Sequence, residues 1–191
     1  MHSPKLWNDL TLLWIIFAAY LAFSAGRVRI KKAIAIRAYL LESCGILPAA
    51  LLVFWPKTHF SILASRFEND FTIEAVGFVI AIAGLAFAAW SRNVLGRNWS
   101  ARALIRTNHE LVTFGPYAYL RHPLYTGLLV ALAGSALVSG EYGALLGWIL
   151  LVGIFAIKAR REEHLLESEF GALYSTYRKG TGFLLPRIAH V

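Results

Sequence analysis

The residues best suited to chemistry lie in two short polar stretches, Arg121-His122-Pro123 and Lys158 to Gly171. Proline suits the first turn of a helix and holds the residue before it extended, so His122 is predicted to lie at the N-terminus of an apolar helix that begins at Pro123. Backbone amides and the positive dipole end there favour a bound carboxylate or phosphate, and the charge of Arg121 would add to that field. In the alternative interpretation, His122 only caps the helix and Arg121 extends toward water.

The second stretch has helical spacing, because residues that would share one face of a continuous helix recur every three or four positions: Glu162, Leu166, Phe170, Leu173 and Tyr177. Glu162 lies on this apolar face and is predicted to be the buried, ligand-facing carboxylate, whereas Glu163 is rotated by about 100° and is predicted to be solvated. Lys158 lies one turn before Glu162 and could neutralise it. The alternative is an internal Lys158–Glu162 pair on a helix beside the membrane.

Long apolar segments surround these polar stretches. The 191 residues are 58% hydrophobic and only 16% charged, which rules out a typical water-soluble globule. A helix needs about 20 mostly apolar residues to cross a bilayer, and five segments meet this requirement: about Leu6 to Gly26, Ala38 to Trp55, Phe71 to Ser91, Pro123 to Ser139 and Glu141 to Ile157. The sequence therefore predicts an all-α polytopic membrane protein with about five transmembrane helices. The last two must form a hairpin, because only a short turn joins them.

The positions of the cations predict how the chain is oriented in the membrane. Of the nineteen Lys and Arg residues, sixteen lie after the first span, after the third span or in the C-terminal tail. The opposite side has three, Lys5, Lys57 and Arg66. By the positive-inside rule, the N-terminus lies outside and the C-terminus in the cytoplasm. The net charge of +8 therefore reflects topology and contact with anionic lipid, and we expect no nucleic-acid partner.

Several kinds of chemistry lack their motifs in this sequence. The six histidines form no HExxH motif and no clustered histidine boxes, so no metal site is expected. There is no GxSxG nucleophile elbow, and no GxGxxG or P-loop follows a strand. The single cysteine, Cys44, excludes an internal disulfide framework.

The stretch from His109 to Gly127, HELVTFGPYAYLRHPLYTG, belongs to an ordered set of motifs. One predicted helical hairpin follows it, then Glu162-Glu163, and then Phe170-Gly171, Tyr174, Tyr177 and Leu185-Pro186. This order resembles the isoprenylcysteine carboxyl methyltransferase (ICMT) family over roughly the C-terminal half of the chain. The combination of RHPxYxG with the downstream EE pair carries the specificity. The three N-terminal spans resemble the family only in number and hydropathy.

The resemblance implies an integral membrane methyltransferase that binds S-adenosyl-L-methionine between a cytoplasmic loop and a C-terminal helix, without a Rossmann domain. It implies one domain over residues 1–191, with three spans in 1–91 and the cofactor-binding loop, the hairpin and a cytoplasmic C-terminal helix in 92–191. The positions that match the family's cofactor-contacting motif are His109, Leu111, Val112, Tyr117, His122, Pro123, Tyr125 and Glu162.

The candidate catalytic residues follow the cofactor positions in the chain. The position at which the prenylcysteine enzymes carry a substrate-contacting arginine falls on Lys158, and a lysine point charge cannot reproduce an arginine fork. A carboxylate acceptor needs a cation to orient it, and the candidates are Lys158, Arg160 and Arg161. An amine or thiol acceptor must instead lose a proton, and the candidate bases are Glu162, Glu163 and His122. The residues assigned to catalysis are Lys158, Arg161 and Glu163.

The methyl acceptor is expected to be lipophilic or lipid-anchored, reached from the membrane lipid at the cytoplasmic face. A cell membrane is expected for a prokaryotic source and the endoplasmic reticulum for a eukaryotic one. The alternatives are a phospholipid-amine N-methyltransferase, a small-thiol S-methyltransferase, an NADPH-dependent sterol-type reductase that shares the RHPxYxG segment, and a non-catalytic membrane assembly protein. The sequence does not define an oligomeric state.

Overall fold

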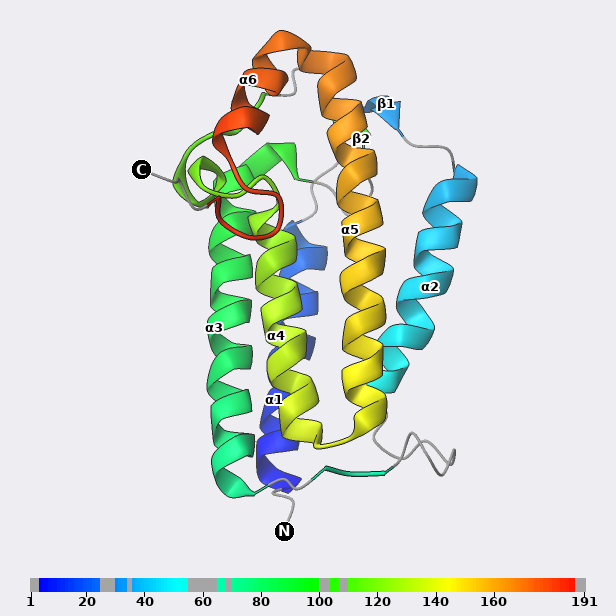
Figure 1. The fold of residues 1–191 in the computed structure, drawn as a ribbon, viewed down its shortest axis with the longest axis vertical. Coiled ribbons are helices and arrows are strands. Elements are labelled where there is room, and N and C mark those ends of the chain that lie inside the picture. Colours follow the sequence, from blue (N-terminus) through cyan, green and yellow to red (C-terminus); the bar gives the residue numbers. More distant parts are fainter. Residues whose placement is uncertain are drawn as a thin grey trace.

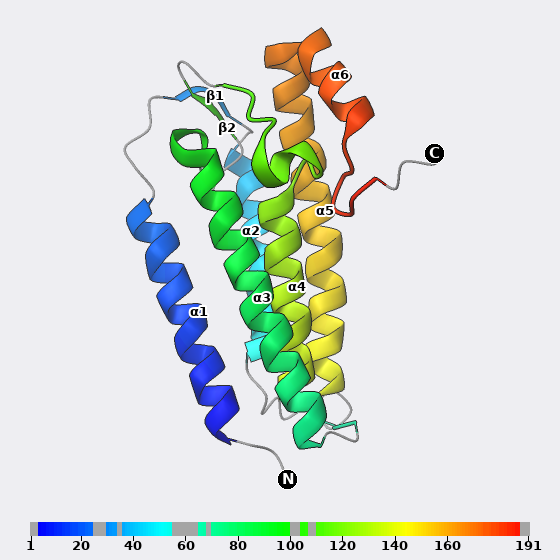
Figure 2. The ribbon, with the colours of Figure 1, turned by 90° about the vertical axis from the view of Figure 1, so that its left-hand side faces the viewer.

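The computed structural model describes residues 4–24, 30–33, 36–54, 65–67, 70–99, 104–106 and 110–187. Five long helices run side by side in a bundle: α1 (Pro4–Ser24), α2 (Ile36–Phe54), α3 (Phe71–Leu95), α4 (Pro123–Ser139) and α5 (Tyr142–Phe170). The N-terminus lies at one end of the bundle, and a shorter helix, α6 (Ala172–Gly180), lies at the other (Figures 1 and 2). The predicted all-α membrane fold is confirmed.

Three helices in the described part of the chain are long and apolar enough to cross a membrane, over Lys5–Ser24, Phe71–Asn98 and Tyr142–Phe170. Two shorter apolar helices, Cys44–Phe54 and Pro123–Ser139, lie among them. The sequence did not predict the two short antiparallel strands at the α6 end, β1 (Ile30–Ala33) and β2 (Leu104–Arg106). Two short 3-10 turns complete the described elements, η1 (Gly96–Asn98) and η2 (Gly115–Ala118).

The predicted hairpin of α4 and α5 is present, and its ends follow from local chemistry. Pro123 is the first residue of α4, a position where an amide hydrogen would have no acceptor within the helix, so its absence in proline costs nothing. Gly140 ends α4 with a φ of 69°, in the left-handed region that glycine tolerates, and its amide donates to the Ala136 carbonyl. One residue, Glu141, then separates Gly140 from the start of α5.

Small residues let α3 and α4 pack closely along their length. A Cβ atom added to Gly84 on α3 would lie 2.4 Å from the Ala131 amide nitrogen and 2.7 Å from the Gly127 carbonyl oxygen on α4. Gly77 and Gly134 meet in the same way one step further along the two helices. Close backbone approach through small residues is a common way to associate helices where lipid leaves little hydrophobic driving force.

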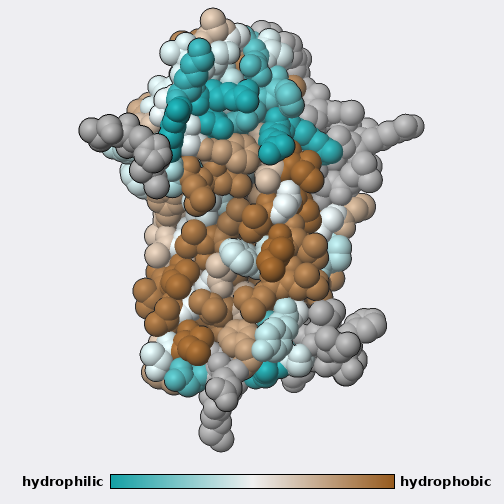
Figure 3. Space-filling view, in the orientation of Figure 1, coloured by the Kyte–Doolittle hydropathy of each residue, from teal (hydrophilic) through white to brown (hydrophobic). Residues whose placement is uncertain are grey.

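The outer surface of the bundle is apolar around its middle (Figure 3). Large hydrophobic side chains such as Ile15 on α1, Val79 on α3 and Ile149 on α5 are each about 60% exposed, at 60%, 64% and 58%. A water-soluble protein rarely exposes so continuous an apolar surface, whereas a lipid-facing surface requires it. Hydrophilic residues gather at the end that carries α6, which is the end where the candidate site lies.

The helix that follows the last span is shorter than the sequence pattern predicts. The three-to-four-residue spacing predicts a continuous helix through Tyr177, but α5 ends at Phe170, and Gly171 has a φ of 53°. The chain then turns back as α6, and Leu173 is 62% exposed instead of lying on the predicted apolar face. A glycine can adopt a positive φ and end a helix, although the residues before and after it keep the sequence spacing of a continuous helix. The spacing alone therefore does not reveal the break.

Candidate functional site at the polar end of the bundle

Two segments far apart in sequence run side by side and form the base of the site. Leu120 pairs with Gly182 in a parallel bridge. The Arg121 amide donates to the Gly182 carbonyl at 2.8 Å, and the His122 amide donates to the Phe183 carbonyl at 3.3 Å. A Cβ atom on Gly182 would lie 1.9 Å from the Leu185 carbonyl oxygen, so this turn requires glycine. The segment from Arg178 to Leu184, called the chain end below, thereby fixes the position of the segment that precedes α4.

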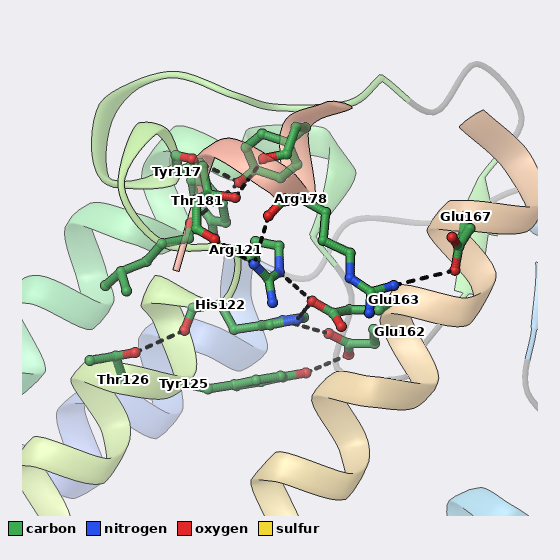
Figure 4. Close-up of polar contacts among 12 residues, drawn as sticks. Tyr117, Arg121, His122, Tyr125, Thr126, Glu162, Glu163, Glu167, Arg178 and Thr181 are labelled. Atoms are coloured by element: carbon green, nitrogen blue, oxygen red, sulfur yellow. Dashed lines mark hydrogen bonds and ion pairs between the residues drawn. The ribbon is translucent and has the colours of Figure 1, made fainter. Parts of the chain in front are cut away.

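His122 lies between two carboxylates of α5 (Figure 4). Its Nδ1 atom is 3.7 Å from Glu162 Oε2, and its Nε2 atom is 3.5 Å from Glu163 Oε1. The imidazole, 5% exposed, stacks parallel to the Tyr125 ring with centroids 5.7 Å apart and meets the edge of the Phe183 ring. The side chain makes no capping hydrogen bond to α4. His122 is thus the N-cap residue of α4 by position, while its side chain faces the two carboxylates of α5.

Arg121 turns into the site and links α5 to the chain end. Its Nε atom donates to Glu163 Oε1 at 2.5 Å, and its Nη1 atom donates to the carbonyls of Thr181 at 2.5 Å and Arg178 at 3.2 Å. Its side chain is only 12% exposed, so the alternative in which Arg121 extends toward water is wrong. Arg121 satisfies a carboxylate and two backbone carbonyls with one guanidinium group.

Glu163 is the more buried of the two glutamates, whereas the sequence predicts Glu162. Glu163 is buried and paired with Arg121, with a side chain 10% exposed, whereas the side chain of Glu162 is 21% exposed. The prediction that Glu163 is solvated is therefore wrong, and Glu162 is only partly buried, although it faces Tyr125 and His122. A helical wheel of α5 alone cannot show that Arg121, α6 and the chain end cover the Glu163 side of the helix.

Tyr125 and Lys158 lie beside Glu162. The Tyr125 hydroxyl donates to Glu162 Oε1, and the Lys158 Nζ atom lies 5.6 Å from the Tyr125 ring centroid. Lys158 is 9% exposed, so its charge acts within the site rather than in bulk water. The prediction that Lys158 and Glu162 share one face of α5 fits this arrangement.

The surroundings of the site keep Glu163 charged and its buried tyrosines neutral. Glu163 lies beyond Ile157, the residue at which the apolar part of α5 ends. Burial by itself would raise the Glu163 pKa, but contacts with His122 and Arg121 outweigh burial and lower the pKa to about 2. Burial raises the Tyr177 pKa to about 12 and also raises the pKa of Tyr174, which faces the Glu163 charge. Tyr177 therefore remains a hydrogen-bond donor at neutral pH, and its hydroxyl donates to the Tyr117 carbonyl at 2.7 Å.

A cavity of about 520 Å³ opens beside Glu163, between α5 and the chain end. This volume lies within the roughly 300–1,000 Å³ typical of small-molecule sites. Arg178 Nη1 and Glu167 Oε2, both partly exposed, lie 3.7 Å apart beside it. The cavity is lined by Arg121, Arg160, Glu163, His164, Glu167, Arg178 and Phe183.

The structure gathers most of the predicted site residues at this end of the bundle. The residues that lie together are Tyr117, His122, Pro123, Tyr125, Lys158, Glu162 and Glu163. Leu111 and Val112 are partly buried in the segment before η2, and their role stays a prediction. His109 lies outside the described residues. Arg161, which the sequence analysis assigned to catalysis, is partly buried and does not line the cavity, whereas its neighbour Arg160 does.

Sequence reasoning assigned no role to Arg178, Thr181 or Phe183, although all three contact the site. No motif marks them, since two of them contribute backbone carbonyls to Arg121 and the third contributes an aromatic edge. Tyr174 and Tyr177 did carry a signal, because both are part of the motif order quoted for the resemblance.

The fold and the site define an integral membrane helix bundle with an ionisable site at one end. Residues 75–168 match the model of the isoprenylcysteine carboxyl methyltransferase (ICMT) family. The chain is 38% identical over 82 residues to the protein-S-isoprenylcysteine O-methyltransferase of Schizosaccharomyces pombe, covering 42% of this chain and 35% of that protein. It is 30% identical over 113 residues to the Arabidopsis thaliana enzyme B of that name, covering 58% and 57%.

A relative with a different name matches over a similar length. The nickel-cobalt-cadmium resistance protein NccN of Alcaligenes xylosoxydans xylosoxydans is 31% identical over 130 residues, covering 63% of this chain and 55% of that protein. The chain thus spans between 35% and 57% of the length of these three relatives. The solved structure of a eukaryotic intramembrane Ras methyltransferase, ICMT, shares the fold, with a TM-score of 0.57 and 22% identity over 76% of this chain and 52% of that one.

Proposed function

We propose that this chain is an S-adenosylmethionine-dependent membrane methyltransferase that acts on an amphiphilic acceptor, most simply the carboxylate of an isoprenylcysteine. The single observation that carries this proposal is the position of His122 between Glu162 and Glu163, at the polar end of an apolar bundle. The family match of residues 75–168 and the names of the relatives support the methyl-transfer chemistry.

The residues at the site fit the chemical groups of S-adenosylmethionine. Its ammonium and ribose hydroxyls require acceptors, which Glu162 and Glu163 provide, and its adenine requires aromatic surfaces, which Tyr117 and Tyr125 provide. The buried His122 Nε2 atom lies 3.5 Å from Glu163 Oε1 and makes no closer hydrogen bond in the described structure, so a polar ligand group could satisfy it. When bound, the cofactor would supply a methyl group activated by a sulfonium charge.

The work left to the protein is alignment and the exclusion of water. Methyl transfer is an in-line displacement, and a carboxylate acceptor needs no general base. Lys158 and the arginines beside it would orient that carboxylate, while the two glutamates and His122 hold the donor. An acceptor with a lipid chain would reach the site from the bilayer, because the α5 part of the cluster begins at Lys158, directly after the apolar run that ends at Ile157.

We propose that this polar end faces the cytoplasm. The N-terminus lies at the opposite end of the bundle from α6, as an odd number of spans requires (Figure 1). Sixteen of the nineteen Lys and Arg residues lie in the segments assigned to the α6 side, which the positive-inside rule places in the cytoplasm. Cysteine labelling from either side of sealed vesicles, with cysteines placed at the two ends, tests this orientation.

Ligand binding to the detergent-purified chain tests the cofactor. We expect calorimetry to show saturable binding of S-adenosylmethionine and S-adenosylhomocysteine, and NADPH to leave that binding unchanged. Glu162→Gln should weaken binding by about tenfold or more, because it removes a charged hydrogen-bond acceptor. The matched control is Asp9→Asn, which changes an exposed carboxylate on α1 and should bind normally.

Labelled methyl transfer to a prenylcysteine, to phosphatidylethanolamine and to a small alkyl thiol then ranks the acceptors. Transfer to the prenylcysteine carboxylate supports the proposal in full. Transfer only to the amine or the thiol keeps the methyltransferase and corrects the acceptor. Binding of NADPH without adenosyl ligands would overturn the proposal in favour of a reductase.

A further inference from the structure

Residues 182–187 form a tight turn that projects Leu185 outward. A Cβ atom on Gly182 would lie 2.7 Å from the Arg187 amide nitrogen, and the Arg187 guanidinium donates to the Lys179 carbonyl near the end of α6. Both arms of the turn are therefore held in place. At its tip, Leu184 packs inward against the hydrophobic core, whereas Leu185 is 76% exposed.

The tip of this turn lies beside the first turn of α4. The Thr126 hydroxyl donates to the Leu184 carbonyl at 2.7 Å. In Figures 1 and 2, the red turn reaches the level at which α4 begins. One residue after Thr126, a Cβ atom on Gly127 would lie 2.6 Å from the Ala88 amide nitrogen of α3. The tip therefore lies at about the depth of Ala88 in the bundle.

This depth is the edge of the lipid-facing surface. Trp90, two residues beyond Ala88 on α3, is 52% exposed, and exposed tryptophans are enriched at the boundary between lipid and water. On α5, Ile157 is 53% exposed, and the Nζ atom of the next residue, Lys158, lies 5.6 Å from the ring of Tyr125 in the first turn of α4. Two helices thus place the same boundary beside the start of α4.

The neighbours of Leu185 suit the same layer. Tyr119 is 70% exposed, and its carbonyl accepts a hydrogen bond from the Gly182 amide at 3.0 Å. Arg187, which is also exposed, follows Leu185 by two residues. Tyrosine rings and long cationic side chains are favoured at the headgroup level, where their apolar parts meet lipid and their polar ends meet water.

We propose that the 182–187 turn is a membrane anchor that inserts the Leu185 side chain into the outer edge of the acyl-chain layer, on the side of the bilayer that faces α6. Its partner is the lipid itself, because the exposed tip continues the apolar surface of the helices at the same depth. The anchor concerns lipid contact, so it does not depend on which ligand the site binds.

The anchor also holds the base of the site. The carbonyls of Gly182 and Phe183, both within three residues of Leu185, accept hydrogen bonds from the amides of Arg121 and His122. Because the connection is so short, release of the tip from the bilayer would loosen both bonds. Contact of Leu185 with lipid therefore slows the local opening of the segment before α4.

Spin labels on the full chain test the depth of the tip. The chain is placed in nanodiscs of phosphatidylcholine and phosphatidylglycerol, with Cys44→Ser to remove the native cysteine. Leu185→Cys, Leu173→Cys and Ile149→Cys then each carry one label, at side chains that are 76%, 62% and 58% exposed. The three positions are thus matched in exposure and differ in their expected depth.

The two reference positions bracket the result. Ile149 lies in the apolar part of α5, whereas Leu173 follows the end of α5, which continues about 20 Å beyond Ile157. We expect the label at Leu185 to be relaxed mainly by oxygen, which concentrates in lipid, as at Ile149. The label at Leu173 should be relaxed mainly by a water-soluble nickel chelate.

Two results would overturn the anchor. One is a response at Leu185 that is dominated by the nickel chelate, as at Leu173, which would place the tip in water. The other is spin–spin broadening at Leu185 that disappears on dilution with unlabelled protein, which would assign the patch to a second copy of the chain.

Hydrogen exchange in the same nanodiscs tests the link to the site. Leu185→Asp places a charge at the edge of the acyl-chain layer, where it is unfavourable, and should speed exchange at the amides of Arg121 and His122. Leu173→Asp is the matched control and should leave this exchange unchanged, with a Tm in detergent equal to that of Leu185→Asp. Wild-type exchange in Leu185→Asp, or equally fast exchange in both variants, would overturn the link.

Discussion

Arg121 and Glu163 form an ion pair that joins three separate parts of the chain. The Nε–Oε1 distance is 2.5 Å, and the two side chains are only 12% and 10% exposed. The same guanidinium also holds the carbonyls of Thr181 and Arg178 at the chain end. The segment before α4, the polar end of α5 and the chain end therefore depend on one another through a single side chain.

Removing Arg121 should loosen the chain end as well as the site. Arg121→Gln leaves the Glu163 carboxylate buried without its partner, and breaking such a pair typically costs about 3–5 kcal/mol. We expect a clearly lower Tm and faster hydrogen exchange across residues 177–184, measured in detergent by thermal melting and mass spectrometry. Arg97→Gln, a change in the exposed η1 turn, should alter neither. Normal exchange at the chain end in Arg121→Gln would contradict the link.

The contribution of Glu163 to stability should depend on pH. Its pKa is about 2 in the folded protein, below the ordinary glutamate value of about 4.3. A group whose pKa falls on folding stabilises the protein above the unfolded pKa, and this stabilisation is lost as the pH falls toward the folded pKa. The Tm of the wild type should therefore exceed that of Glu163→Gln at pH 6.5, and the difference should shrink between pH 5 and pH 3. A difference that is constant over this range would show that the carboxylate charge is not its source.

The Tyr125 hydroxyl should matter for ligand binding more than for folding. Tyr125→Phe keeps the ring that stacks on His122 and removes the donor to Glu162. We expect S-adenosylmethionine binding to weaken by about threefold to tenfold, as for one net hydrogen bond, with a Tm close to that of the wild type. The control is Tyr142→Phe, an exposed tyrosine at the opposite end of the bundle. Calorimetry measures the S-adenosylmethionine affinity of both variants. Equal affinities would show that the Tyr125 hydroxyl takes no part in ligand binding.

The close contact of α3 and α4 should make Gly84 intolerant of any side chain. Gly84→Leu would place atoms inside the van der Waals limits of Ala131 and Gly127, so the helices must separate. We expect a loss of about 2 kcal/mol or more, seen as a lower Tm in detergent. Gly153→Ala on α5, where an added Cβ meets nothing within 4 Å, should be neutral or slightly stabilising. A neutral Gly84→Leu would contradict the close packing.

Much of the fold could be predicted from the sequence. Pro123 and Gly140 mark the two ends of α4, because one has no amide hydrogen and the other tolerates a positive φ, and both effects are local. The spans are equally local, since a bilayer demands a run of apolar residues whatever surrounds it. The placement of His122 at the start of α4 and of Lys158 and Glu162 on one face of α5 follows from the same local rules.

The burial of Glu163 could not be predicted from the residues that neighbour it in the sequence. Its environment is set by Arg121, 42 residues earlier in the chain, and by α6, whose direction depends on one positive φ at Gly171. Helical periodicity ranks the faces of α5 only by the apolar residues on them, and it predicts the wrong carboxylate as the buried one. The sequence alone determined which residues could be charged, capped or inserted in a bilayer, since these are properties of short segments. Only the tertiary structure decided which charges meet and which are shielded from water, because desolvation depends on every segment that packs around a group.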